Sequence, residues 1–443
     1  MRLSSASLIH FVLASSVIGS AISYSNVYLF HISLGLLILG LIFSRKNNAS
    51  KGTLYFPKNP FVYFLYFLVF WYSLSVFWSI DPLRSLQYLI YIILGFSLVF
   101  IINAFVIDRS RYQSVFNTLR LMFLMAICIA VLEVLTDFRL PTSPYSQYAS
   151  YFGHKATNFD LFNSATQDRI RAMPTSFWGN PNTFSAAMTL IAPFFLMHRR
   201  SWVKFLGTAT LLFVVVMAGS RGAFVGLIFG IALFAVIKGW RSWGGLILLL
   251  ILVALNISGL KQSEIPVVAE FSRAPELVKS YLFEDHAAER NSLGYRQQLI
   301  QNGLQALWET GGLGVGGGAS ITVQERAGVV AGKFTSMHNF WVEILVEAGV
   351  VFFLLFTAWY SCLSMKLYFI FRKSQSYFFK YHAGALFIGS VVFLISAISA
   401  SSVIYLLPMW LFFGMSIAVV RVYRIEAATA EGSTKNYSTS ELF

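Results

Sequence analysis

Apolar stretches of about 16 to 25 residues recur along almost the whole chain, the length that a helix needs to cross the hydrocarbon core of a bilayer. A backbone in lipid must satisfy its own hydrogen bonds, so such stretches are interpreted as transmembrane helices. Twelve are predicted, at residues 5–23, 25–44, 60–78, 85–107, 114–136, 181–197, 203–219, 222–238, 243–260, 339–365, 383–401 and 403–420.

Two of these spans have an alternative interpretation. The last two are separated by a small-residue break at Ser399 to Ser402, so a count of eleven stays open. The first follows Arg2 and ends in small residues near Ala21, a pattern that a cleaved signal peptide shares. Under either interpretation the sequence predicts an all-α polytopic membrane protein.

Composition agrees with this class. Of 443 residues, 57% are hydrophobic and 12% are charged, which is too apolar for a water-soluble globule. The net charge of +14 resides in short clusters between apolar stretches, which indicates cytoplasmic loops and argues against nucleic-acid binding. Cys128 and Cys362 both fall in apolar stretches, so neither a disulfide nor a zinc site is predicted.

The distribution of lysine and arginine predicts that both termini face the cytoplasm. Nineteen of these residues fall in segments that this arrangement places inside, whereas the short outer loops carry only Arg84 and Arg221. Residues 1–424 are expected to form one transmembrane helical domain with two long outward loops, 137–180 and 260–337. Residues 425–443, small and polar, are expected to be a disordered cytoplasmic tail.

The segment 260–337 is the most polar part of the chain and holds eight of its 19 acidic residues. It is either an inserted soluble module or a loop that builds a site on one side of the bilayer, and we favour the loop. Within it, apolar residues follow Arg296 at helical spacing, which predicts an amphipathic helix against the bundle or the outer interface. These apolar residues are Leu299, Ile300, Leu304, Leu307 and Trp308.

Arg221 is a candidate anion-binding residue. It lies in Gly219-Ser220-Arg221-Gly222, between two spans and on the outer side, where positive charge is otherwise avoided. The guanidinium fork suits phosphate oxygens, and small neighbours let a bulky anion approach. The alternative is an arginine that extends to lipid headgroups.

His338 stands where the polar segment meets the next apolar span, at the predicted outer mouth of a long helix. An imidazole with an ordinary pKa near 6.5 can accept a hydroxyl proton, and the alternative is a capping or packing role. Glu343 and Glu347 share a helical face turned away from His338. Both are expected to satisfy buried donors or arginines.

Two further elements surround these candidates. Arg171 precedes a Pro-Asn turn that leads into the next span, with Asn182 as the expected helix N-cap. The glycine-rich run from Gly311 to Gly318 lacks the ending of a phosphate-binding loop and predicts a flexible or tight turn that a ligand could approach. No acidic or histidine cluster predicts a metal, so no cofactor is expected.

These motifs together resemble the O-antigen ligase and polymerase superfamily, which includes Wzy-like repeat-unit polymerases and teichuronic-acid or exopolysaccharide polymerases. The resemblance lies in residues 170–350 and rests on their order and outward placement. It is carried by Gly179-Asn180-Pro181-Asn182, Gly219-Ser220-Arg221-Gly222, Arg296, Gly314 to Gly318, His338-Asn339, Glu343 and Gly349.

The resemblance implies an inverting, metal-independent glycosyltransferase with the membrane-helical fold of enzymes that use lipid-linked sugars. Its donor would be a glycan on undecaprenyl pyrophosphate, in the bacterial inner membrane. Arg221 and Arg296 would bind the pyrophosphate, and His338 would accept the proton of the acceptor hydroxyl. Arg171, Asn182 and Glu343 are expected in support of this site.

Alternatives remain at the level of function. The sequence following Asn182 and the run His338-Asn339-Phe340-Trp341 favour a polymerase over a ligase that transfers glycan to lipid A core. Expected partners are the lipid-linked donor, the glycan or lipid A core acceptor, membrane lipids and a chain-length regulator. A transporter would need ionisable residues deep in the bundle, where Arg120 and Glu133 are the conspicuous ones.

Overall fold

A computed structural model describes residues 5–45, 55–161, 164–238, 292–328, 336–398, 400 and 403–432. Every structural statement below concerns these residues, and the predicted span 243–260 lies outside them. The chain divides into two compact units. The first comprises Met1–Leu54, Gln113–Phe283 and Ile388–Ser396, and the second comprises Tyr55–Tyr112, Glu284–Phe387 and Ala397–Phe443.

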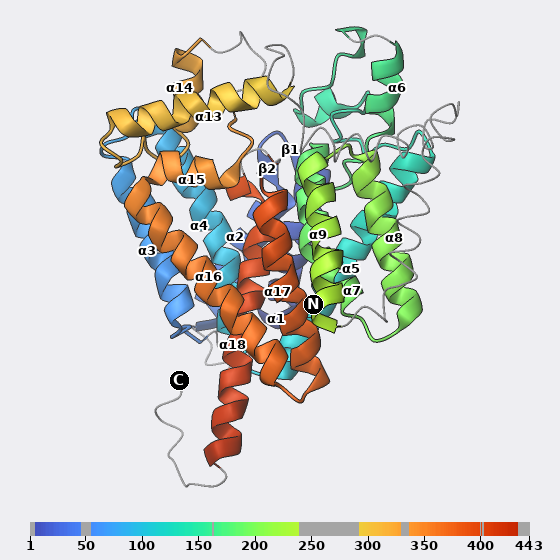
Figure 1. Ribbon diagram of the computed structural model, residues 1–443, viewed down its shortest axis with the longest axis vertical. Coiled ribbons are helices and arrows are strands. Elements are labelled where there is room, and N and C mark those ends of the chain that lie inside the picture. The colour runs from blue at the N-terminus through green and yellow to red at the C-terminus, as the bar shows by residue number, and fades with distance from the viewer. Residues whose placement is uncertain are drawn as a thin grey trace. The chain divides into compact units, whose positions relative to one another are not determined.

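The described residues are mainly α-helical, as the sequence predicts (Figure 1). Short elements join some helices: a hairpin of β1 (Ser23–Tyr24) and β2 (Val27–Tyr28), and four 3-10 turns, η1 (Gly19–Ala21), η2 (Ala149–Phe152), η3 (Phe159–Leu161) and η5 (Val403–Tyr405). The helices are α1 (Ser5–Ile18), α2 (Leu29–Arg45), α3 (Pro60–Ser75), α4 (Pro82–Phe105), α5 (Arg109–Leu135), α6 (Ser164–Ala172), α7 (Pro181–Leu196), α8 (Ser201–Met217), α9 (Arg221–Lys238), α13 (Ser292–Glu309), α14 (Ser320–Arg326), α15 (Phe340–Ala348), α16 (Val350–Lys373), α17 (Tyr377–Ser396) and α18 (Leu407–Gly432).

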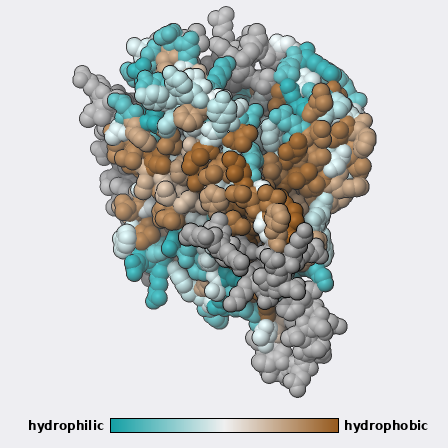
Figure 2. All heavy atoms as spheres, turned by 180° about the vertical axis from the view of Figure 1, so that it is seen from behind, coloured by the Kyte–Doolittle hydropathy of each residue, from teal (hydrophilic) through white to brown (hydrophobic). Residues whose placement is uncertain are grey.

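Five helices are long and apolar enough to cross a membrane, namely α4, α5, α9, α16 and α17. Four shorter apolar helices accompany them, at Ala6–Ala21, Leu29–Phe43, Pro60–Ser75 and Ser201–Met217. Hydrophobic side chains dominate the middle of the face in Figure 2, with hydrophilic ones toward its upper end. The chain is therefore an all-α integral membrane protein.

In the first unit, helices pack closely where small or polar residues allow it. The hydroxyls of Ser15 on α1 and Ser33 on α2 lie 2.6 Å apart. Helix α7 packs against both α8 and α9. A Cβ added to Gly207 of α8 would lie 2.0 Å from the ring of Phe195 on α7, so glycine is needed there.

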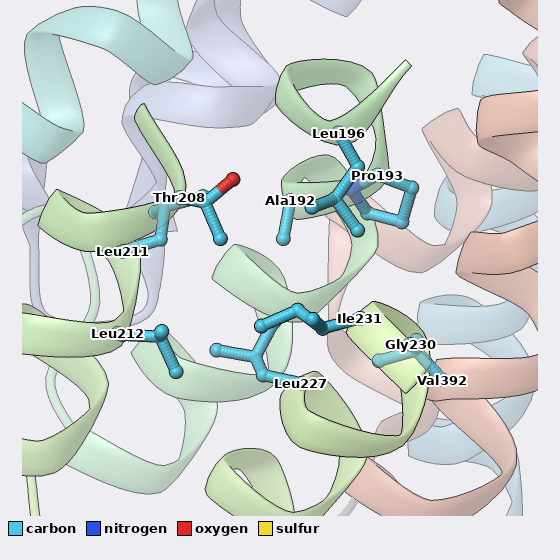
Figure 3. Close-up of a pocket in the computed structure, with 10 residues that line it drawn as sticks. All are labelled: Ala192, Pro193, Leu196, Thr208, Leu211, Leu212, Leu227, Gly230, Ile231 and Val392. Atoms are coloured by element: carbon cyan, nitrogen blue, oxygen red, sulfur yellow. The ribbon is translucent and has the colours of Figure 1, made fainter. Parts of the chain in front are cut away.

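A pocket in this unit is lined almost entirely by apolar side chains from α7, α8, α9 and α17 (Figure 3). The hydroxyl of Thr208 is buried there and has no hydrogen-bond partner among the described residues. None of the predicted site residues lines this pocket. Its lining comprises Ala192, Pro193, Leu196, Thr208, Leu211, Leu212, Leu227, Gly230, Ile231 and Val392.

In the second unit, α4 packs against α3 and α18, and α16 packs against α3 and α18. The α4–α18 contact is close because Gly95 lies under Trp410, whose indole Nε1 would be 2.2 Å from an added Cβ. Helix α13 lies across the ends of these helices and packs against α14 and α15 (Figure 1). The loop that was predicted to build a site thus contains helices that cover one end of this bundle.

The predicted span 339–365 is wrong as a single helix. The chain breaks at Gly349, with φ +87°, into α15 and α16. A side chain at Gly349 would meet the carbonyl oxygen of Leu313 at 2.3 Å, so the break is fixed by a close backbone contact. The nine-residue α15 is too short to span a bilayer, and His338 therefore precedes a short helix.

Helix ends show two further differences from the sequence prediction. Asn180 caps α7 by accepting a hydrogen bond from the backbone N–H of Asn182 at 2.8 Å, so Asn182 lies in the first turn and is not the cap. Helix α18 continues to Gly432, into the segment predicted as a disordered tail. Residues 433–443 lie outside the described part of the chain.

Candidate functional site

The contact between α13 and α15 places the residue before His338 directly on α13. A Cβ added to Gly303 would lie 1.9 Å from the methyl carbon of Met337 and 3.2 Å from a methyl of Val346. Met337 is fully buried. A side chain at this position would displace the end of Met337, so the segment leading into α15 packs closely against the middle of α13.

Arg296 lies on the same face of α13 as this contact. It precedes Gly303 by seven residues, about two helical turns, so both point in nearly the same direction. Leu299, between them on that face, is buried, and Arg296 itself is half-buried. The structure therefore places His338 next to the α13–α15 contact and Arg296 on the same face of α13, about two helical turns away from it.

The backbone of His338 adopts the left-handed conformation, with φ +49°. This is uncommon for residues other than glycine, and such strain persists only where surrounding structure enforces it. On one side, the hydroxyl of Ser336 accepts the backbone N–H of His338 at 3.4 Å. On the other, the side chain of Asn339 caps α15 by accepting the N–H groups of Trp341 and Val342. His338 is half-buried.

Two buried acids lie on the next turns of α15. Glu347 accepts a 2.6 Å hydrogen bond from the hydroxyl of Ser320, and the backbone N–H groups of Gly318 and Ser320 also donate to it. These donors oppose the effect of burial, which nevertheless raises the pKa of Glu347 to about 7. The expectation that this acid satisfies buried donors is thus confirmed for Glu347.

Glu343 differs from its neighbour. It is 3% exposed, and neither carboxylate oxygen has a hydrogen-bond partner among the described residues. Burial, together with the charge of Glu347, raises the pKa of Glu343 well above its ordinary value. A buried carboxyl without donors favours its neutral form, which is the direction of this pKa shift.

The glycine-rich segment does not form an open loop for a ligand in the part that can be described. A Cβ added to Gly314 would lie 2.6 Å from the carbonyl oxygen of Glu347. A Cβ added to Gly316 would lie 2.4 Å from Ser79, and one added to Gly318 would lie 2.2 Å from the ring of Tyr88. The bare backbone is needed for contacts within the protein itself, and these contacts hold the far end of α15.

Arg221 is the first residue of α9, after a turn in which Gly219 has φ +67°. Free backbone N–H groups and the helix dipole make a helix N-terminus favourable for anions and unfavourable for a cation. A half-buried arginine at this end therefore adds to a positive potential. This arrangement suits a phosphate group. Arg221 belongs to the first unit, as do Arg171 and Asn182.

Arg171 lies at the end of α6 and is exposed. Its guanidinium lies over the ring of Phe159, 5.1 Å from the ring centre. Its backbone carbonyl accepts a hydrogen bond from the guanidinium of Arg139. These contacts tie α6 to its own loop, and they give Arg171 a structural role alongside the support role expected from sequence.

Glu133, conspicuous in the sequence as an ionisable residue inside a span, has a local structural role. Its carboxylate accepts the backbone N–H groups of Thr175 at 2.8 Å and Ser176 at 2.7 Å. Arg139 lies 3.9 Å from the same carboxylate. Glu133 thus holds the turn that leads into α7, which is a different task from carrying a substrate through the bundle.

Sequence reasoning did not predict the structural roles of two residues that build the site, Asn339 and Ser320. Asn339 had a local signal, because asparagine directly before an apolar helix is a good N-cap. Ser320 had none, since its partner Glu347 is 27 residues away and only the tertiary fold brings them together. Among the described residues, no three or more His, Cys, Asp or Glu side chains gather as a metal site.

Comparison with known proteins matches this region to a family. The O-antigen ligase family matches residues 206–357, which include Arg221, Arg296, His338 and Glu343. The chain is also 25% identical to the teichuronic acid biosynthesis protein TuaE of Bacillus subtilis (strain 168) over 380 residues, 81% of this chain and 72% of that protein. Arg171 and Asn182 lie outside the family match. Both similarities support the resemblance of this chain to the O-antigen ligase and Wzy-like superfamily, and with the apolar helices they point to an integral membrane protein of bacteria.

Proposed function

We propose that this protein is an inverting, metal-independent glycosyltransferase that polymerises oligosaccharide repeat units linked to undecaprenyl pyrophosphate. The reaction takes place on the outer face of the bacterial inner membrane. Its product is a cell-surface polysaccharide such as O-antigen, capsule or exopolysaccharide. The observation that carries this proposal is His338, held in a strained backbone conformation at the contact of α13 and α15, with Arg296 on the contacting face of α13.

The reaction is a single displacement at the anomeric carbon of the donor sugar. The acceptor hydroxyl oxygen forms the new bond while the bond from carbon to the pyrophosphate oxygen breaks, and the leaving oxygen takes the electron pair. The neutral imidazole of His338 accepts the hydroxyl proton. Attack opposite the leaving group inverts the configuration at this carbon, and no enzyme carboxylate is needed as nucleophile.

Arg221 and Arg296 bind the pyrophosphate and stabilise the charge that develops on it. Guanidinium groups bind phosphate oxygens through paired hydrogen bonds, and this stabilisation is stronger at a site from which water is excluded. Two such cations can replace the metal ion that pyrophosphate release often requires. Glu343, a buried acid at the start of α15, supports the site, and Asn182 and Arg171 support the turn before α7.

The topology needed for this reaction is that expected from sequence: eleven or twelve spans, one membrane domain over residues 1–424 and both termini in the cytoplasm. The asymmetric distribution of lysine and arginine supports this orientation. It places segments 137–180 and 260–337 outside, where lipid-linked glycans, the acceptor and a chain-length regulator would meet the enzyme.

The relative and the family match favour different acceptors. The function named for the Bacillus subtilis relative, teichuronic acid biosynthesis, favours chain building. The family match, described as O-antigen ligase, favours transfer to lipid A core. We favour chain building because that similarity extends over 81% of the chain, whereas the family match ends at residue 357.

The test is an in vitro reaction of the purified full chain with lipid-linked repeat units alone, in excess chelator, resolved by product length. A ladder of longer lipid-linked glycans is expected. A product that forms only after lipid A core is added would replace the polymerase with a ligase. The absence of product with both acceptors would contradict a glycosyltransferase and favour transport of the lipid-linked glycan.

A further inference from the structure

The far end of α15 is held by hydrogen bonds to other segments of its unit. The backbone N–H groups of Val315 and Gly316 donate to the carbonyls of Val346 and Glu347, at 2.9 and 3.1 Å. The indole N–H of Trp71 donates to the carbonyl of Ala348 at 2.9 Å. These bonds occupy carbonyl groups at a helix end that would otherwise lack partners.

A side-chain contact fixes the same end. Ser320 and Glu347 are 1% and 2% exposed, and the hydroxyl of Ser320 lies 2.6 Å from the Glu347 carboxylate. Loss of Glu347 would leave the Ser320 hydroxyl without this acceptor, which costs about 1 to 3 kcal/mol. Loss of the hydroxyl would leave Glu347 with the backbone N–H groups of Gly318 and Ser320 as its donors. The glycine-rich segment, which leads into α14 and Ser320, has no space for side chains at Gly314 or Gly316, so it cannot move away without losing these contacts.

The near end of α15 carries the residue on which the reaction depends. His338 lies one residue before the cap Asn339, and the N–H of Phe340 donates to the carbonyl of Ala397 at 3.1 Å. Nine helical residues span about 13 Å, and a short helix transmits a tilt at one end to the other. The strained φ of His338 makes this position sensitive to such a tilt, because a small movement lets the backbone relax.

We propose that Glu347 is a positioning residue for His338, acting through its contact with Ser320 and through the orientation of α15. This inference rests on the proposed role of His338 as proton acceptor. Glu347 itself does not touch the reacting atoms. Its carboxylate anchors the far end of α15 to the glycine-rich segment, and this anchor keeps the imidazole in the orientation that accepts the hydroxyl proton.

The first experiment measures the position of His338 without any substrate. The full chain in detergent is treated with diethylpyrocarbonate at neutral pH, and modification of His338 is followed by peptide mass spectrometry. We expect a several-fold change in the modification rate in Glu347→Ala and Ser320→Ala, and little change in Glu347→Gln, whose amide oxygen still accepts the serine hydroxyl. The matched control is Glu309→Gln, an exposed glutamate at the end of α13.

Kinetics then separate positioning from loss of structure. Ser320→Ala is expected to lower kcat by about tenfold, which corresponds to about 1.4 kcal/mol in activation free energy. The KM for the lipid-linked donor should not change in this variant. Glu347→Gln should retain activity. An unchanged rate of His338 modification in both Ser320→Ala and Glu347→Ala would overturn the positioning role. If Glu347→Ala fails to fold, Ser320→Ala and Glu347→Gln decide the question. Because the modification is read on the protein itself, its result is independent of whether the polymerase ladder appears.

Discussion

Met337 occupies the space that a side chain at Gly303 would need: an added Cβ would lie 1.9 Å from the methionine methyl carbon. This contact is part of the packing between α13, which carries Arg296, and the segment around α15 that carries His338. Met337 and Gly303 have no reactive side-chain group, so any effect of these two residues on function would come through packing alone.

Gly303→Leu is expected to lower the thermal midpoint of the protein and its transferase activity. The added side chain would meet both Met337 and Val346, and overpacking of this kind costs about 1 to 3 kcal/mol. Gly303→Ala should be milder, because a helical alanine gains up to about 1 kcal/mol over glycine and the methionine end is flexible. The control is Gly35→Ala in α2, where nothing lies within 4 Å, and which should stabilise. A Gly303→Leu protein with normal activity would contradict the importance of this contact.

Arg221→Lys should abolish most transferase activity while the protein inserts normally in the membrane. Lysine keeps the positive charge but loses the planar fork that binds two phosphate oxygens at once. A fall of about 100-fold in kcat/KM is expected, the size seen when one donor to a developing negative charge is removed. Arg84→Lys is the matched control, since Arg84 pairs with Glu325 at 3.1 Å. Near-normal polymer on a gel from Arg221→Lys would count against phosphate binding.

His338→Ala should bind the lipid-linked donor with normal affinity and fail to transfer it. Removal of a proton acceptor lowers the rate of the chemical step by about 100-fold to 10,000-fold without touching the pyrophosphate. His154→Ala serves as control, because His154 makes a 2.8 Å contact with Ser23 in the first unit. Binding is measured with the lipid-linked glycan in detergent, and a large loss of donor affinity in His338→Ala would assign this residue to binding instead.

The helical class is predictable because span length and apolar composition are local properties of the sequence. The start of α4, for example, follows from Asp81-Pro82, where the aspartate caps the helix and proline occupies its first turn. The break at Gly349 is different. The apolar run continues through it, and the cause is the carbonyl of Leu313, 36 residues earlier, which leaves no space for a Cβ. A contact of that kind is set by the tertiary fold.

In the candidate site, too, some features can be predicted from the sequence and others depend on the tertiary fold. The orientation of Arg296 follows from the helical spacing of the apolar residues after it, and the sequence indicates it. The bond between Ser320 and Glu347, and the absence of donors to Glu343 in the described part of the chain, depend on how the glycine-rich segment folds onto α15. The glycines correctly predict tight turns, as at Gly314 with φ +93°. They do not predict that other parts of the chain fill the space beside them.

The last prediction concerns pH and the buried acid Glu347. Its pKa is raised from the ordinary 4.5 to about 7, so the folded protein keeps a proton that the unfolded chain releases above pH 4.5. The protonated carboxyl of Glu347 contributes fully to the free energy of unfolding below pH 4.5. This contribution is lost as the pH rises through about 7, and the loss is about 3 kcal/mol. Glu343, Tyr72 and Tyr88 are the titratable groups that interact with this acid.

Glu347→Gln cannot titrate and should remove this part of the pH dependence. Thermal midpoints of the two proteins in detergent, measured from pH 4.5 to 8, should diverge in favour of the variant as the pH rises. Groups that do not interact with Glu347 are common to both proteins and cancel in the difference. Glu343 interacts with Glu347, so the difference reports on this pair of acids together. The exposed control Glu309→Gln should give a constant difference from the unaltered protein. A Glu347→Gln difference that is also constant with pH would show that this carboxyl titrates normally, and that burial on α15 does not hold its proton.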